Sequence, residues 1–187
     1  RIWYKYGSIG LAINSHKTII SVKHSQNVVS DLPKKYILPL IKYLKLKSAK
    51  SNFEIKTLQK SPSQIGLGSG TQLSLSIGMA VSKLFNLNLE ANDIANIYNR
   101  GKRSCTGISI FKQGGFVVDA CKKARLLPRY MFKSKFPKDW RIILLNDIKL
   151  KGTSGKRENK FFSKSSRTNH KQSELSHILF RGILPSI

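Results

Sequence analysis

The stretch that most constrains this chain is the glycine-rich segment 66–72, which reads Gly-Leu-Gly-Ser-Gly-Thr-Gln. Residues 53–58 before it alternate apolar and polar side chains, which predicts a half-buried strand. Apolar residues after it recur at helical spacing up to Leu84, which predicts an amphipathic helix that starts near Gln72. Glycines leave the backbone amides uncovered, so several N–H groups can converge beside the positive helix end. This arrangement predicts a phosphate-binding loop.

The same glycine spacing also fits an ordinary tight connection between a strand and a helix, which would bind nothing. Two familiar nucleotide-binding motifs do not fit. The P-loop ends in Gly-Lys-Ser/Thr, whereas Gly70 is followed by Thr71 and Gln72. The dinucleotide fingerprint places its third glycine one position later, and no parallel βαβ unit is evident around this segment. A different type of phosphate loop is therefore required.

A second segment with binding chemistry is the basic stretch 100–107, which reads Arg-Gly-Lys-Arg-Ser-Cys-Thr-Gly. Its cations can clamp a pyrophosphate, because charge-assisted hydrogen bonds are strong and arginine is bidentate. The alternative is a solvated basic turn without a ligand. A predicted strand at 116–119 then ends in Asp119, which fits either a metal- or substrate-binding acid or an acid that only forms hydrogen bonds.

The formal net charge of +25 fits a nucleic acid, an anionic membrane surface or a polyanionic small substrate. The alternative is that scattered lysines are simply solvated, since only residues 149–171 form a dense basic stretch, which predicts a polar loop. No apolar run approaches the roughly 20 residues of a membrane span. Cys105 and Cys121 are too few for a metal site or a disulfide framework, which favours reduced thiols in a cytoplasmic protein.

The remaining pattern predicts a mixture of strands and helices. Strands at 7–13 and 18–22 are expected to form a hairpin around a turn at 14–16. A helix at 32–46 is expected to hold Pro39 in its first turn. Three further elements are a helix capped by Asn88 or Asn92 that stops at Gly101, a buried strand at 141–145 and a helix at 174–180.

Residues 62–73 resemble the phosphate loop of the GHMP small-molecule kinase superfamily, and their Gly-Thr-Gln ending is similar to β-ribofuranosylaminobenzene 5'-phosphate synthase. The resemblance continues in order along most of the chain. It runs through residues 100–104, Gly107, Ile108, Phe111, 114–119, Phe136, Pro137, Trp140, Arg141, 152–155 and Glu158.

This resemblance implies an α+β fold with a GHMP-kinase N-terminal domain, which is like domain 2 of ribosomal protein S5. We expect that domain at 1–140 and the truncated start of a C-terminal α+β domain at 141–187. Relatives have a further first strand before Arg1 and a substantial domain after Ile187. We therefore expect a fragment that is inactive by itself, because the second domain completes the catalytic cleft.

The resemblance implies a reaction other than phosphoryl transfer. When Ser104 to Gly115 is aligned with the corresponding kinase segment, Gly107 occupies the position of the catalytic aspartate. Glycine can neither orient nor deprotonate a nucleophile. The synthase family joins phosphoribosyl pyrophosphate to 4-aminobenzoate or 4-hydroxybenzoate in methanopterin biosynthesis, and releases pyrophosphate and CO2. An ATP-dependent small-molecule kinase is the alternative, and a basic nucleic-acid-binding protein is a third.

The resemblance also implies the site. The expected cofactor is Mg²⁺, which commonly binds pyrophosphate oxygens. The oligomeric state is left open, with a homodimer as one option, and no membrane partner is expected. The expected catalytic residues are Lys102, Arg103 and Asp119. The expected phosphate- or substrate-binding residues are Gly66, Gly68, Ser69, Gly70, Thr71, Gln72, Arg100 and Ser104.

Several positions depart from the synthase pattern. Relatives tend to have histidine at Gln64, glycine at Asn99 and Cys105, and a glycine pair at 120–121. Cys105 lies inside the basic stretch, where the loss of glycine's conformational freedom is expected to shift the cations.

Overall fold

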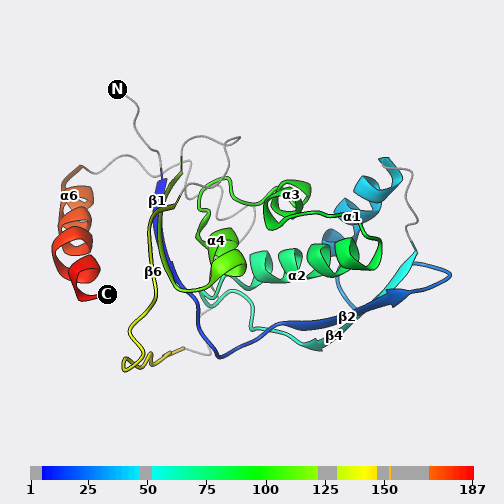
Figure 1. Ribbon diagram of the computed structural model, residues 1–187, viewed down its shortest axis with the longest axis horizontal. Coiled ribbons are helices and arrows are strands. Elements are labelled where there is room, and N and C mark those ends of the chain that lie inside the picture. Colours follow the sequence, from blue (N-terminus) through cyan, green and yellow to red (C-terminus); the bar gives the residue numbers. More distant parts are fainter. Residues whose placement is uncertain (1–5, 47–51, 122–129, 147–151, 153–168) are drawn as a thin grey trace. The chain divides into compact units, whose positions relative to one another are not determined.

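A computed structural model describes residues 6–46, 52–121, 130–146, 152 and 169–187 (Figure 1). The chain divides into two compact units, residues 1–133 and 134–187, and each is described by itself. Helices and two small sheets make up the first unit, which confirms the predicted α+β class. The predicted domain boundary after residue 140 stays a prediction.

The first unit contains two three-stranded sheets. In one, β5 (Phe116–Cys121) lies between β1 (Tyr6–Leu11) and β6 (Tyr130–Ser134), and β1 runs antiparallel to β5 with Ser8 opposite Asp119. In the other, β4 (Phe53–Gln59) lies between β2 (Ile19–His24) and β3 (Val29–Ser30). There β2 is antiparallel and β3 is parallel to β4.

The predicted hairpin of the first two strands is wrong, although both strands exist. β1 pairs with β5 and β2 pairs with β4, so the two consecutive strands belong to different sheets. Each takes a partner whose side chains are buried, such as Val117 in β5 and Phe53 in β4. Alternating side chains define a strand, but packing against neighbours selects its partner.

Helix α2 (Ser69–Leu84) lies at the centre of the first unit, where it contacts α1 (Lys34–Leu46), α3 (Ala91–Ile97), α4 (Thr106–Gln113) and β2 (Figure 1). Its apolar face joins α1 and β4 in the main core. The fully or almost fully buried core residues on these three elements are Leu40, Leu44, Phe53, Ile55, Leu73, Ile77 and Val81. This core fixes both ends of α2 relative to the neighbouring loops.

Two predicted helix details need correction. Pro39 lies inside α1, at its sixth residue and not in its first turn. Proline lacks an N–H, so α1 forgoes one backbone hydrogen bond there and is held by its buried face. The start of α3 is capped by Glu90, which forms a capping box with Asp93, and not by Asn88 or Asn92.

Other elements were missed or misplaced. Neither α4 nor β6 was predicted. Helix α4 was missed because it is only 8 residues long and has no capping side chain. Residues 141–146 are exposed and form no strand, so the predicted buried strand there is wrong. An apolar run needs a neighbouring strand to satisfy its backbone groups, and none pairs with it in the described residues.

The second unit contains helix α6 (Asn169–Ile178), which confirms the predicted C-terminal helix although it begins earlier. It continues into a π-helical turn, η1 (Leu179–Ile183), and a 3-10 turn, η2 (Leu184–Ser186). Most of the predicted basic loop at 149–171 lies outside the described residues. Among the described helices, none combines the length and apolar composition of a membrane span.

Candidate phosphate-binding site

The glycine loop, residues 64–70, has a backbone that suits anion binding. Gln64, Gly66 and Gly68 have φ angles of 65°, 83° and 60°, whereas Ile65 and Leu67 between them do not have positive φ. Alternation of positive and negative φ is one feature of the concave backbone arrangements that bind anions. The backbone of the loop is therefore compatible with the predicted phosphate site, which stays a prediction.

The loop leads directly into the N-terminus of α2. Gly68 is the N-cap, and its carbonyl accepts hydrogen bonds from the amides of Thr71 (2.9 Å) and Gln72 (3.1 Å). No side chain caps this end of the helix. A Cβ atom added to Gly66 or Gly68 would meet nothing within 4 Å. The loop therefore presents backbone amides and a positive helix end to open space.

The basic turn, residues 100–105, lies against this helix end. The Arg100 Nη2 atom donates a hydrogen bond of 3.4 Å to the Gly70 carbonyl. The Gln72 Nε2 atom donates one of 3.0 Å to the Gly107 carbonyl. A Cβ atom on Gly107 would lie 3.3 Å from Thr71 Cγ2, so glycine permits the close approach of α4 to α2. The structure thus brings Gly70, Thr71 and Gln72 together with the two ends of the basic stretch.

Exposure differs along the basic turn. Arg100 and Lys102 are exposed, whereas Arg103 and Ser104 are half-buried and Cys105 is buried. The turn is therefore only partly solvated, and the choice between a pyrophosphate clamp and a basic turn without a ligand stays a prediction. Lys102 and Arg103 lie between Arg100 and Ser104 in this turn, and their catalytic roles remain predictions.

A buried hydrogen-bond network anchors the basic turn to the sheet. Asp119, which is 1% exposed, accepts hydrogen bonds from Ser8 Oγ and the Cys105 amide, and from Ser104 Oγ at 3.4 Å. The Ser104 hydroxyl also lies 2.6 Å from that of Ser8 and 2.7 Å from that of Thr106. These contacts agree with the alternative in which Asp119 only forms hydrogen bonds. It holds the turn, and α4 behind it, against β1 and β5.

Both carboxylate oxygens of Asp119 accept hydrogen bonds from the protein, and its role as a catalytic residue stays a prediction. Within the part of the chain that the structure describes, no three His, Cys, Asp or Glu side chains gather as a metal-binding group. Hard oxygen ligands for Mg²⁺ can come from a bound pyrophosphate instead.

The positions that depart from the synthase pattern are accommodated in different ways. Asn99 has a φ of 57°, a conformation that asparagine adopts more readily than most residues with a side chain. Cys105 has a φ of −106°, which any residue adopts, and its thiol lies 3.5 Å from the Gly101 carbonyl. Cys105 therefore sits without backbone strain, and the expected shift of the cations relative to the synthases stays a prediction.

Two tyrosines beside the site were not identified from the sequence as site residues. Tyr36 of α1 lies with its hydroxyl oxygen 3.7 Å from the point where a Cβ atom on Gly70 would be. The Tyr98 hydroxyl donates a hydrogen bond of 2.6 Å to the Tyr36 carbonyl. Burial raises the pKa of Tyr98 well above its usual value, and the charge of Arg100 opposes this only in part. In the sequence, aromatic residues on helices indicate core packing. The pattern therefore does not mark these two tyrosines as residues beside the site.

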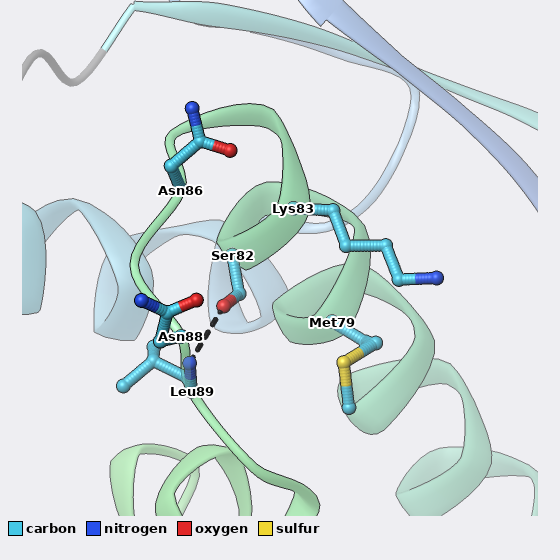
Figure 2. Close-up of a pocket in the computed structure, with 6 residues that line it drawn as sticks. All are labelled: Met79, Ser82, Lys83, Asn86, Asn88 and Leu89. Atoms are coloured by element: carbon cyan, nitrogen blue, oxygen red, sulfur yellow. Dashed lines mark hydrogen bonds between the residues drawn. The ribbon is translucent and has the colours of Figure 1, made fainter.

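Figure 2 shows a hollow of about 560 Å³ at the other end of α2, formed by residues of the helix and of the loop that follows it. Ser82 Oγ accepts a hydrogen bond of 2.9 Å from the Leu89 amide there, and Asn86 and Asn88 have positive φ. The polar groups thus serve the turn itself. At 1.5 Å per helical residue, Ser82 is about 20 Å from the start of α2. This hollow is separate from the glycine loop.

Comparison with known proteins identifies the same segments. The family of GHMP kinases N terminal domains matches residues 34–115, which include the glycine loop, α2 and the basic turn. A beta-ribofuranosylphenol 5'-phosphate synthase of Archaeoglobus fulgidus is 36% identical over 148 residues, which cover 72% of this chain and 47% of the relative. A synthase with the same name from Methanothermobacter thermautotrophicus is 26% identical over 207 positions, which cover 97% and 63%.

Among solved structures, the mevalonate kinase of L. major in complex with R-mevalonate is 15% identical, with a TM-score of 0.45 over 66% of this chain and 45% of the kinase. The chain spans about half to two thirds of the length of the two synthases. The sequence matches cover the glycine loop and the basic turn in the order found here. The chain belongs to the beta-ribofuranosylphenol 5'-phosphate synthase family, within the GHMP kinase superfamily.

Proposed function

We propose that this chain provides the phosphate-binding part of an enzyme that transfers a phosphoribosyl group to an aromatic acid. The substrates are phosphoribosyl pyrophosphate and 4-hydroxybenzoate or 4-aminobenzoate, as in methanopterin biosynthesis, and the products include pyrophosphate and CO2. The observation that carries this proposal is the uncapped glycine loop at the start of α2, with Arg100 hydrogen-bonded to Gly70 beside it. A diphosphate group suits such a concentration of amide donors and positive charge.

In this reaction the bond between the anomeric carbon and the pyrophosphate oxygen breaks, and the bonding electrons leave with pyrophosphate. The ring carbon that carries the carboxylate forms a bond to the anomeric carbon. CO2 then leaves, and the electrons of its bond restore the aromatic ring. The protein's task is to hold the two substrates together and to stabilise the charge on the departing pyrophosphate. Amides of the glycine loop and the cations Arg100, Lys102 and Arg103 supply that stabilisation.

Mg²⁺ belongs to this proposal as an ion that enters on the pyrophosphate oxygens, where it would neutralise part of their charge. The hydrogen bonds that Asp119 accepts from Ser8, Ser104 and Cys105 support this assignment, since they engage both of its oxygens within the protein. Asp119 instead keeps the basic turn in place.

The environment of Gly107 favours this reaction over phosphoryl transfer. By the resemblance to the kinase segment, the residue takes the position of the catalytic aspartate, and glycine supplies no general base. Space is also restricted, because a Cβ atom there would lie 3.3 Å from Thr71 Cγ2 and 3.9 Å from Gln72 Nε2. A side chain at this position would require the Thr71 side chain to shift by a few tenths of an ångström.

The proposal is tested with the full-length protein that contains this chain. It is incubated with phosphoribosyl pyrophosphate, Mg²⁺ and either aromatic acid labelled in its carboxyl group, and labelled CO2 is measured. In parallel, ATP is supplied with a panel of small alcohols. We expect CO2 release that depends on phosphoribosyl pyrophosphate, and no phosphorylated alcohol. Phosphorylated product without CO2 release would replace the synthase by a kinase.

A further inference from the structure

One polar side chain beside the glycine loop has no part in the mechanism described above. Tyr36, the third residue of α1, is 9% exposed. Its hydroxyl forms no hydrogen bond among the described residues. That oxygen is also not one of the fully buried polar atoms without a partner in the described part of the chain. A phenol hydroxyl without a partner among the described residues can donate a hydrogen bond to a ligand beside it.

The hydroxyl and the Arg100 guanidinium lie around one point. A Cβ atom on Gly70 would be 3.7 Å from Tyr36 Oη and 3.6 Å from Arg100 Nη2. Because Cα–Cβ bonds in a helix tilt toward its N-terminus, this point lies beside the first turn of α2. A neutral donor and a cation therefore lie beside the positive end of α2. Their common ligand is an anion with several acceptor oxygens.

The phenol is also held in position. Tyr36 belongs to the main core with Ile37 and Leu40 of the same helix. Its backbone carbonyl accepts the hydrogen bond of 2.6 Å from Tyr98, which lies two residues before Arg100. The end of α3 thus fixes the backbone that carries the phenol and leads into the residue that carries the guanidinium. A side chain placed in advance loses little conformational entropy when a ligand binds.

We propose that Tyr36 is a further ligand-binding residue, whose hydroxyl donates a hydrogen bond to a phosphate oxygen held at the start of α2, with Arg100 contacting the same phosphate. This inference rests on the proposed function, because it assigns a donor to the same phosphate site. It also explains the lack of a side chain at Gly70, since a methyl group there would enter the space between the phenol and the guanidinium.

Pyrophosphate is titrated calorimetrically, with Mg²⁺ present, into the full chain and into the Tyr36→Phe and Tyr43→Phe variants. Both variants remove only a hydroxyl, and Tyr43 lies on α1 two turns beyond Tyr36. We expect Tyr36→Phe to bind about tenfold more weakly, the size of one lost charge-assisted hydrogen bond. We expect Tyr43→Phe to bind like the unchanged chain. Melting temperatures of all three should agree, because the phenyl ring preserves the packing.

The outcomes separate this inference from the function on which it rests. If the unchanged chain binds pyrophosphate and Tyr36→Phe binds equally well, Tyr36 is only a core residue and the phosphate site stands without it. If both tyrosine variants weaken binding to the same degree, the effect belongs to α1 in general, and the assignment of the hydroxyl is wrong. If the unchanged chain does not bind pyrophosphate, both this inference and the proposed phosphate site fail.

Discussion

The glycine loop and the basic turn are two short connections that each lead into a helix, yet they are built in opposite ways. The glycine loop relies on backbone conformation, with three positive φ angles in residues 64–68 and open space beside Gly66 and Gly68. The basic turn relies on side chains, because the buried Asp119 carboxylate binds its Ser104 hydroxyl and Cys105 amide. The conformation of the first depends on its own backbone, and that of the second depends on contacts with the protein interior.

This difference separates binding from stability. Amide donors in the glycine loop need only the correct backbone, so a change there should affect ligand affinity more than folding. The network below the basic turn is desolvated, so the loss of one member leaves polar groups without partners in the interior. A change there should affect folding first, and ligand affinity as a consequence.

The largest effect, a loss of folding stability, is expected at Asp119, the centre of the hydrogen-bond network below the basic turn. Asp119→Ala should lower the free energy of unfolding by about 2–4 kcal/mol, because the Cys105 amide and two hydroxyls lose their acceptor. Urea denaturation measures this loss, and the matched control is Asp139→Ala at an exposed position. If the two variants were equally stable, the network would not anchor the basic turn.

Arg103→Ala should have the next largest effect, and on binding. Loss of a bidentate contact to pyrophosphate should reduce the affinity by about 1.5–3 kcal/mol, or roughly ten- to hundredfold. Because Arg103 is half-buried, a small loss of stability should accompany it. The control is Lys102→Ala, an exposed point charge that should contribute less. Calorimetric titration of pyrophosphate compares the two variants. Equal losses of affinity would contradict a bidentate contact from Arg103.

Gly107→Asp tests the contact between the two helix ends. The new side chain would press on Thr71, so we expect the free energy of unfolding to fall by about 1–3 kcal/mol, as is usual for overpacking. We also expect no ATP turnover in the full-length protein. Gly107→Ala separates the effect of size from that of charge, since it adds only the Cβ atom. A kinase activity gained by the aspartate variant would show that α4 accommodates an acid.

The smallest effect on folding is expected in the glycine loop. Gly68→Ala imposes a φ of 60° on a residue with a side chain, at a cost of about 1–2 kcal/mol, although no atom lies near the new methyl group. Pyrophosphate binding should weaken as the loop relaxes away from this conformation. Gly182→Ala is the matched control, because it also meets nothing within 4 Å but lacks a positive φ. Equal behaviour of the two variants in thermal unfolding and in titration would contradict a conformational role for Gly68.

The sequence by itself determined the strand, loop and helix around residues 66–72. The signals there are local, since alternation, glycine spacing and helical periodicity each act over a few neighbouring residues. The ancestry of the chain was also readable, because the glycine loop and the basic stretch follow the order of the synthase motifs. The comparisons confirmed that relationship.

Only the tertiary structure decided which strands pair, what Asp119 binds and how Tyr36 approaches Gly70. Strands β1 and β2 were readable as strands, but β5 and β4 lie far along the chain, so no local pattern identified them as partners. Asp119 meets Ser8 and Cys105, and Tyr36 reaches Gly70, through contacts of the same long-range kind. Such contacts arise because burial of apolar surface brings distant segments together. The chemistry that results depends on the neighbours that the core selects.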